Sequence, residues 1–338
     1  MEAYKALALQ TTCHAVNALA PAAARAQILA NIRRIERQIE ASKRFIGRDL
    51  RLVVLPEYFA SGFPMGESFA LWQEKACFEI GGKEYEALSA LAVQYDIYLS
   101  GNVYELDPHF PDLYFQSSFV IDPKGACILR YRRLNSMFAP TPHDVWDKYL
   151  EIYGLEGVFP VADTELGRLA CIASEEILYP EIARCLMMRG AEVFLHATSE
   201  VGSPLLTQKG VAKLARAIEN MAYVVSANSA GIAGIDIPFA STDGLSKIIN
   251  YEGLVLCEAG YGESMVAHAT IDINALRHHR QRPAMANFIA RQRFELFAES
   301  YQTHSFYPPN TFETQKPDRH VFLQNIQRVI KQYMGTET

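Results

Sequence analysis

The sequence predicts an α/β protein with mixed β-sheets, and two patterns carry that prediction. Short apolar runs typical of buried strands alternate with longer segments of helical spacing. Two pairs of strand-like runs are joined by tight turns, at Pro123-Lys124-Gly125 and at Glu252-Gly253. The alternation alone favours a parallel, doubly wound sheet. Hairpins pair antiparallel strands, so we expect mixed sheets.

Each element follows from its local pattern, in chain order. Buried strands are expected where apolar or β-branched residues run together, and helices where apolar residues recur every three or four positions. The strands expected on this basis are 5–11, 52–55, 97–104, 116–122, 126–133, 169–173, 223–227, 246–251, 254–258 and 265–271. The expected helices are 21–45, 84–95, 179–189 and 211–220, and residues 137–157 form an insert of mixed character.

The domain organisation is expected to be simple. The chain has 338 residues and contains no internal repeat, low-complexity segment or linker that would separate two domains. Residues 1–300 are therefore predicted to form one domain. Residues 301–338 are predicted to form a C-terminal tail that follows a charged helix starting near residue 274.

Composition narrows the class of protein. The chain is 49% hydrophobic and 21% charged, with a formal net charge of −6, which gives no support for a nucleic-acid or anionic-membrane partner. No apolar run approaches the roughly 20 residues that span a bilayer. Six scattered cysteines without C-x-x-C pairs indicate free thiols in the cytoplasm. The histidines show no metal-ligand spacing, so we expect neither a metal nor a cofactor.

The segment from residue 166 to residue 200 is the most informative part of the chain. It is predicted to form a buried strand, a sharp turn at Ser174, a helix that ends at Gly190 and a second buried strand. A side chain at a strand-to-helix turn is presented near backbone N–H groups that stabilise an anion. Ser174 is therefore a candidate nucleophile.

The same segment resembles the nitrilase, or carbon-nitrogen hydrolase, superfamily. Glu176, Tyr179, Pro180 and Glu181 fall on the family's pattern after its catalytic cysteine. The cysteine position itself is Ser174. The resemblance extends over about residues 4–300, and it implies a four-layer α-β-β-α sandwich of two mixed sheets.

Two further family positions lie upstream. LVVLPEYF matches the strand that ends in the general base, which gives Glu57 that role and places Tyr58 beside the pocket. A carboxylate that ends a buried strand is poorly solvated, and this makes it a usable base. The hairpin that ends in Tyr131-Arg132-Arg133 has Arg133 at the position of the family's lysine. Arginine can donate to an oxyanion but does not release its proton, and a structural ion pair with Glu57 is the alternative role.

A serine in place of the cysteine places a greater demand on the neighbouring base. A serine hydroxyl needs a strong and well-placed base, whereas a thiolate is a good nucleophile near neutral pH. Glu175 replaces an aromatic residue and adds negative charge beside Ser174. The family takes a second, substrate-orienting carboxylate from the region of the insert, where Asp144 is the candidate. Trp146 either lines the substrate pocket or has only a packing role in the core.

Three functions remain open on this basis. The first is an amidohydrolase acting on a small non-peptide amide or nitrile through Glu57, Arg133 and Ser174. The second is a catalytically silent relative that binds a small molecule or a protein. The third is non-covalent acid-base chemistry by Glu57 and Glu175. The resemblance also implies a homodimer or a higher homo-oligomer.

Overall fold

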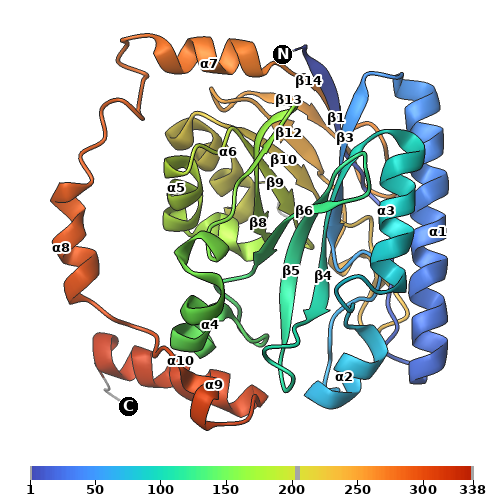
Figure 1. Ribbon diagram of the computed structural model, residues 1–338, viewed down its shortest axis with the longest axis vertical. Helices are drawn as coiled ribbons and strands as arrows, with labels where there is room; N and C mark the ends of the chain where they lie inside the picture. The colour runs from blue at the N-terminus through green and yellow to red at the C-terminus, as the bar shows by residue number, and fades with distance from the viewer. Residues whose placement is uncertain (1, 202–205, 336–338) are drawn as a thin grey trace.

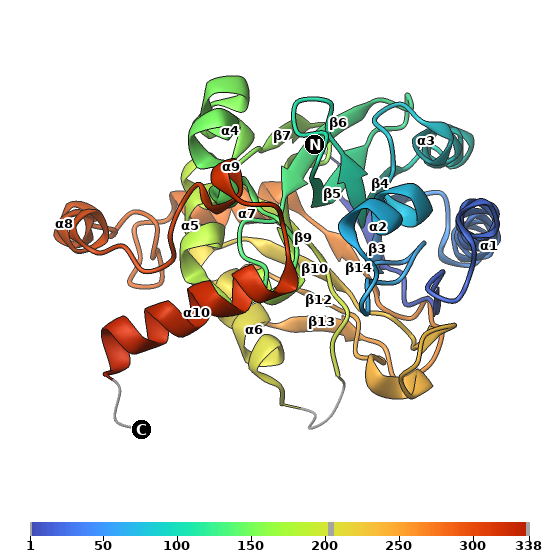
Figure 2. The same cartoon turned by 90° about the horizontal axis from the view of Figure 1, so that it is seen from below.

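Two six-stranded sheets lie face to face between two layers of helices in the computed structural model, which describes residues 2–201 and 206–335. Figure 1 shows the layers side by side, with α1 and α3 outside one sheet and α5 and α6 outside the other. This arrangement confirms the predicted α-β-β-α sandwich. Figure 2, turned by 90°, shows the same order of layers.

The first sheet combines strands from the N-terminal part of the chain with one strand from near residue 270. In spatial order its strands are β14 (His268–Ile271), β1 (Tyr4–Ala8), β3 (Leu50–Glu57), β4 (Tyr98–Leu106), β5 (Tyr114–Ile121) and β6 (Cys127–Arg132). β1, β3 and β4 are parallel neighbours, whereas β14, β5 and β6 pair antiparallel. The predicted hairpin of residues 116–133 is thus the β5–β6 pair.

The second sheet repeats this mixture. Its spatial order is β13 (Val255–Glu258), β12 (Lys247–Ile249), β10 (Tyr223–Ala227), β9 (Val193–Ala197), β8 (Gly167–Ala173) and β7 (Ala162–Thr164). The central strands β8, β9 and β10 are parallel, and the two flanking hairpins are antiparallel. A separate pair joins β2 (Cys13–His14) to β11 (Ile232–Ala233).

The helices on the outer faces bury one apolar stripe each. α1 (Pro21–Ile46) begins with a proline, whose fixed φ suits the first helical turn, and it buries isoleucines at helical spacing. α3 (Lys83–Tyr95) packs beside it, while α5 (Pro180–Met188) and α6 (Gln208–Asn220) cover the second sheet. The main core cluster lies between the sheets and around α5 and α6.

Some elements had no clear signal in the sequence. α2 (Phe69–Ala76) begins at Ser68, whose side chain accepts a hydrogen bond from the N–H of Leu71. The insert contains α4 (Trp146–Tyr153) between the 3₁₀ turns η1 (Pro142–Val145) and η2 (Leu155–Gly157). Another 3₁₀ turn, η4 (Phe239–Ser241), follows β11.

The C-terminal part of the chain is largely helical. It contains α7 (Ile273–Gln281), α8 (Glu295–Thr303), α9 (Thr311–Thr314) and α10 (Arg319–Met334). α8 stands away from the sandwich in Figure 1, whereas Phe312 and Phe322 pack against Val145 and Tyr149 of the insert. The division of the chain near residue 300 stays a prediction. None of the described helices combines the length and apolar character needed to cross a membrane.

Candidate active site

Glu57 and Arg133 form a buried ion pair on the first sheet. Glu57 is the last residue of β3, and Arg133 directly follows β6. Arg133 Nη1 lies 3.2 Å from Glu57 Oε1, and the two side chains are only 6% and 2% exposed. Because a buried charge is costly without a partner, each residue needs the other in the folded state. Arg133 thus forms the ion pair with Glu57 that was considered as its alternative, structural role.

Gln116 of β5 locks this pair in place. Its Nε2 donates to Glu57 Oε1 at 2.6 Å, and its Oε1 accepts from Arg133 Nη1 at 2.6 Å. The same Nε2 also donates to Asn102 Oδ1 at 2.8 Å. All of these side chains are buried. A fully satisfied polar network of this kind is rigid.

Arg133 also reaches across to the second sheet. Its Nη2 donates to Glu175, which follows Ser174, and its Nε donates to the carbonyl of Asn135 at 2.7 Å. Burial would lower the pKa of Arg133, but the Tyr58 hydroxyl and the carboxylates of Glu57 and Glu175 raise it instead. The guanidinium therefore stays charged. A guanidinium has five N–H groups, and these contacts use four of them.

Tyr58 lies beside the ion pair. Its backbone has a left-handed φ of 56°, and its ring stacks on that of Tyr104 with the centroids 5.4 Å apart. Burial raises the pKa of Tyr58, and the charge of Glu57 raises it further. The hydroxyl therefore stays protonated and is a donor for Glu57 or for a ligand. The substrate-binding role of Tyr58 stays a prediction.

Ser174 lies where β8 ends in the second sheet. It begins the 3₁₀ turn η3 (Ser174–Leu178), and α5 starts only at Pro180, so the expected strand-to-helix turn contains an extra turn of 3₁₀ helix. Ser174 has a φ of 49° and is 4% exposed. A left-handed backbone is costly for a residue with a Cβ and recurs at functional sites.

Two buried side chains hold this strained turn. His196 Nε2 donates to the carbonyl of Ser174 at 2.8 Å, while its Nδ1 accepts from the Ser226 hydroxyl at 2.8 Å. Burial, followed by the charge of Lys213, lowers the pKa of His196 to about 3, so the imidazole is neutral. Glu176 accepts hydrogen bonds from the Tyr131 hydroxyl and from three backbone N–H groups.

Lys209 is a site residue that the sequence did not indicate. It lies in the first turn of α6, and its Nζ is 3.0 Å from Ser174 Oγ and 3.4 Å from Thr198 Oγ1. The carbonyl of Thr198 also accepts a hydrogen bond from the Glu57 N–H at 3.2 Å. Lys209 is 35 positions from Ser174, and the helix was expected to begin only at residue 211. No local pattern could therefore have connected the two residues.

Asp144 and Trp146 take up positions in the insert. Asp144 caps η1, where its Oδ2 accepts from the N–H and hydroxyl of Thr141, both at 2.8 Å. Burial raises the pKa of Asp144 to about 6. Trp146 lies against His143 within the cluster that holds the C-terminal phenylalanines. Among the described residues, neither forms a hydrogen bond or ion pair with Glu57, Arg133 or Ser174, so their ligand-binding roles stay predictions.

Cys171 is not available as a replacement nucleophile. It is fully buried in β8, with its Sγ 3.9 Å from Ser100 Oγ. Burial raises the pKa of its thiol to about 12, so the reactive thiolate does not form at neutral pH. Across residues 2–201 and 206–335, no group of three or more histidine, cysteine or acidic side chains is arranged to hold a metal ion.

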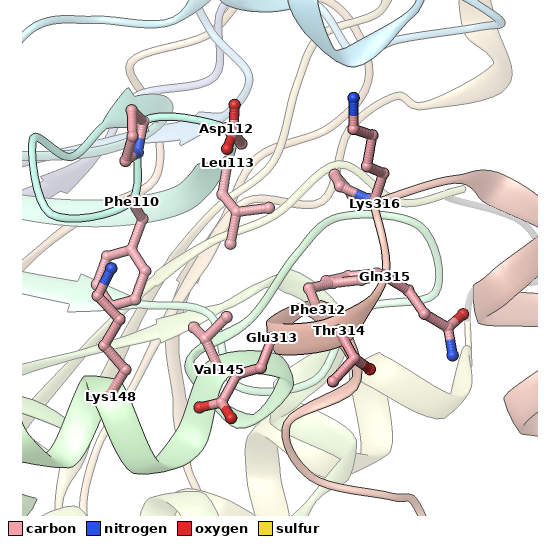
Figure 3. Close-up of a pocket in the computed structure, with 12 residues that line it drawn as sticks. Phe110, Asp112, Leu113, Val145, Lys148, Phe312, Glu313, Thr314, Gln315 and Lys316 are labelled. Atoms are coloured by element: carbon pink, nitrogen blue, oxygen red, sulfur yellow. The ribbon is translucent and has the colours of Figure 1, made fainter.

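A hollow of about 430 Å³ lies away from these residues, between the β4–β5 loop, α4 and the C-terminal segment. Figure 3 shows Phe110 and Lys148 together on one side of it, with Phe312 and Lys316 contributed by the C-terminal segment. None of the predicted site residues lines this hollow. The polar network at the strand ends, rather than this hollow, is therefore the candidate active site.

The fold and the strand-end residues define a hydrolase-like α-β-β-α sandwich, and sequence comparison identifies its family. Residues 15–281 match the carbon-nitrogen hydrolase family, so the chain belongs to that family. The membership predicted from the motifs around Glu57, Arg133 and Ser174 is therefore confirmed.

Individual relatives agree with this assignment. A formamidase from Helicobacter acinonychis (strain Sheeba) is 28% identical over 231 residues, which cover 68% of this chain and 63% of the relative. The match therefore spans less than two thirds of that relative's length.

Solved structures share the fold. A carbon-nitrogen hydrolase from Helicobacter pylori G27 superposes with a TM-score of 0.66 at 19% identity, covering 90% of this chain and all of the other. An amidase from Nesterenkonia sp. AN1, whose structure contains acrylamide added to its active-site cysteine, gives a TM-score of 0.60 at 18% identity. That superposition covers 88% of this chain and 99% of the amidase.

Proposed function

We propose that this chain is an amidohydrolase that acts on a small non-peptide amide or nitrile. One observation carries the proposal: Arg133 binds both Glu57, from the first sheet, and Glu175, the neighbour of Ser174 in the second. Arg133 thus connects the residue at the general-base position with the residue that follows Ser174. Formamidases and an amidase among the relatives support an amide as the substrate.

The residues present have suitable chemistry for acyl transfer. Ser174 is the nucleophile. Arg133 has one N–H that its protein partners do not use, and this group can donate to the oxyanion of a tetrahedral intermediate. The hydrogen bonds from Gln116 and Arg133 both reach Oε1 of Glu57. The carboxylate keeps lone pairs to accept a proton from the water that releases the acyl group.

Local charge limits the substrate. Glu57, Arg133 and Glu175 together carry a net charge of −1. Because the Glu175 side chain is 38% exposed, it is within reach of a ligand. A neutral or weakly cationic amide suits this surface better than an amide with a carboxylate beside its carbonyl. Tyr58 and Glu175 are proposed to contact the substrate, with Asp144 and Trp146 at the border of the site.

Intact mass spectrometry during turnover tests the proposal. The protein is mixed with formamide, longer aliphatic amides and matching nitriles, and we expect product together with an acyl adduct on Ser174. Ser174→Ala should abolish both. Glu57→Gln should form the adduct and release it slowly. The absence of product and adduct with every substrate would contradict the proposal.

The two alternatives predict different results in the same assay. A silent binder would show no turnover, but a ligand would raise its melting temperature. Acid-base chemistry by Glu57 and Glu175 would continue in Ser174→Ala without an adduct.

A triple variant, Ser174→Cys with Arg133→Lys and Glu175→Tyr, restores the family's residues and should raise amidase activity if the pocket is intact. A homo-oligomer and a cytoplasmic location remain part of the proposal.

A further inference from the structure

The contacts of Glu57 and Arg133 leave the activation of Ser174 unexplained. A serine hydroxyl needs a base within hydrogen-bond reach. The Glu57 side chain accepts hydrogen bonds from Gln116 and Arg133 and interacts with the Tyr58 hydroxyl, and Arg133 is permanently charged. Neither of these two triad residues forms a hydrogen bond with Ser174 Oγ.

Lys209 is the titratable residue that does contact the nucleophile. Its Nζ lies 3.0 Å from Ser174 Oγ, which is an ordinary distance for proton transfer along a hydrogen bond. Thr198 Oγ1, at 3.4 Å, orients the amino group from the other side. Since α6 and the end of β9 are both fixed by the sandwich, the amine is held in place before a substrate arrives.

The surroundings of Lys209 contain no carboxylate that would hold it as an ion pair. Three titratable groups interact with it: His196 from β9, Glu200 after β9 and Lys213 one turn further along α6. Glu200 is paired with Lys213, and both are buried. His196 is neutral. Within the part of the chain that the structure describes, no acidic side chain lies within ion-pair distance of Lys209.

Positive charges also lie close together at this turn of α6. Burial lowers the pKa of Lys213, the Glu200 carboxylate opposes this, and the charges of Lys247 and Lys209 lower it further. Lys209 thus has hydroxyl partners and no carboxylate partner among the described residues, and its Nζ is within hydrogen-bond reach of Ser174 Oγ, which is the geometry that a general base requires.

We infer that Lys209 is a catalytic residue that accepts the hydroxyl proton of Ser174 and delivers it to the leaving nitrogen. This inference rests on the proposed amidohydrolase function. As Ser174 Oγ bonds to the carbonyl carbon, its proton moves to the neutral Lys209 amine and the carbonyl electron pair moves to oxygen. When the carbon–oxygen double bond re-forms, the carbon–nitrogen bond breaks. The departing nitrogen takes the proton from Lys209, which becomes neutral again.

The second half of the reaction needs one water molecule. Its proton passes to Glu57 as its oxygen attacks the acyl carbon. When the ester bond breaks, Glu57 returns this proton to the departing Ser174 Oγ, so that the carboxylic acid leaves and both side chains are restored. Acylation then depends on Lys209, and deacylation depends on Glu57. Variants of the two residues should consequently stop the reaction at different stages.

The reaction of Ser174 with a fluorophosphonate tests the inference without an amide substrate. In this reaction Ser174 Oγ bonds to phosphorus, fluoride leaves and the serine proton is taken up by the base. We expect Lys209→Arg and Lys209→Met to label at least about 100-fold more slowly than the unmodified chain, as for loss of a general base. Arginine stays charged and accepts no proton. Gln208→Ala, an exposed neighbour in the same helical turn, should label normally.

The pH dependence of labelling gives a second readout. An amine base titrates in the alkaline range and a carboxylate base in the acidic range. The labelling rate of the unmodified chain should therefore rise toward alkaline pH, and this rise should be absent in Lys209→Arg. A small primary amine added to Lys209→Ala should restore part of the rate. Circular dichroism and melting temperature establish that each variant is folded.

The outcomes separate this inference from the proposed function. If Ser174 fails to label, or labels equally fast in the folded Lys209 variants, Lys209 is not its base. If amides are turned over with a Ser174 adduct and the Lys209 variants keep their kcat, the inference fails and the proposed function stands. If no amide is turned over but labelling depends on Lys209, the amidohydrolase assignment fails and the Ser174–Lys209 pair stands.

Discussion

The two sheets contribute opposite kinds of surroundings to the candidate site. On the first sheet, Glu57, Gln116 and Arg133 are joined by short hydrogen bonds. At the end of a strand of the second sheet, Ser174 has a left-handed backbone. Lys209 of the covering helix α6 contacts the hydroxyls of Ser174 and Thr198 and pairs with no carboxylate among the described residues. The side chains of the first half are hydrogen-bonded to one another, whereas the second half contains a residue with a strained backbone.

The two halves differ in how the surrounding protein stabilises them. A buried ion pair with every neighbour satisfied is costly to break, so the first half acts as a rigid frame. A strained residue persists only where its surroundings hold it. His196 and Glu176 do this for the Ser174 turn. Substitutions in the two halves should therefore have different effects on stability.

The largest expected effect concerns His196, which supports the turn at Ser174. Its pKa is lowered to about 3 in the folded protein by burial and by Lys213, and the value in an unfolded chain is about 6.5. Below pH 6.5 the unfolded state binds more protons, so the free energy of unfolding should fall as the pH drops from 6.5 to 3. The loss from this residue amounts to about 5 kcal/mol.

Urea unfolding between pH 7 and pH 4 measures most of this loss, about 3 kcal/mol. His196→Gln removes the titrating group and should give a shallower dependence of stability on pH, whatever its stability at neutral pH. His320→Gln, which changes an exposed histidine, serves as the matched control and should keep the original dependence. Parallel pH curves for the His196 variant and the unmodified chain would contradict the role of His196.

A slightly smaller effect is expected in the rigid half. Arg133→Ala leaves Glu57 buried without its cation, and loss of one partner from a buried pair costs about 3 kcal/mol or more. Turnover should be lost as well, because the oxyanion donor disappears. Thermal unfolding and amide assays measure the two effects.

Arg168→Ala provides the contrast for Arg133. Arg168 pairs with Asp163 at 3.9 Å on an exposed surface, and such a pair contributes less than about 1 kcal/mol. If the two arginine substitutions lowered the free energy of unfolding equally, the buried Glu57–Arg133 pair would contribute no more than an exposed ion pair. Retained turnover in Arg133→Ala would remove Arg133 from the mechanism.

The smallest expected effect isolates the backbone strain at Ser174. Ser174→Gly and Ser174→Ala both remove the nucleophile and its contact with Lys209. Glycine accepts a φ of 49° without a Cβ penalty, so the glycine variant should be more stable than the alanine variant by about 1 kcal/mol. Urea unfolding of the two proteins compares them directly. An alanine variant of equal or higher stability would show that the turn is not strained.

Much of the frame was predictable because its signals are local. The apolar run before Glu57 and the turn Pro123-Lys124-Gly125 predict the ends of β3 and the β5–β6 hairpin, which position Glu57 and Arg133. Gly190 marks the end of α5 because a left-handed φ of 94° suits glycine. The helices of the insert and α2 lacked such signals, since their apolar patterns are short.

The sequence by itself determined the mixed α/β class, the family and the three candidate positions Glu57, Arg133 and Ser174. Periodicity, turn residues and motifs act over a few neighbouring residues, so they can be read directly from the chain. Only the tertiary structure brought Arg133 to both Glu57 and Glu175, and Lys209 to Ser174. Those contacts arise where two sheets pack against each other, and no local pattern encodes which side chains then meet.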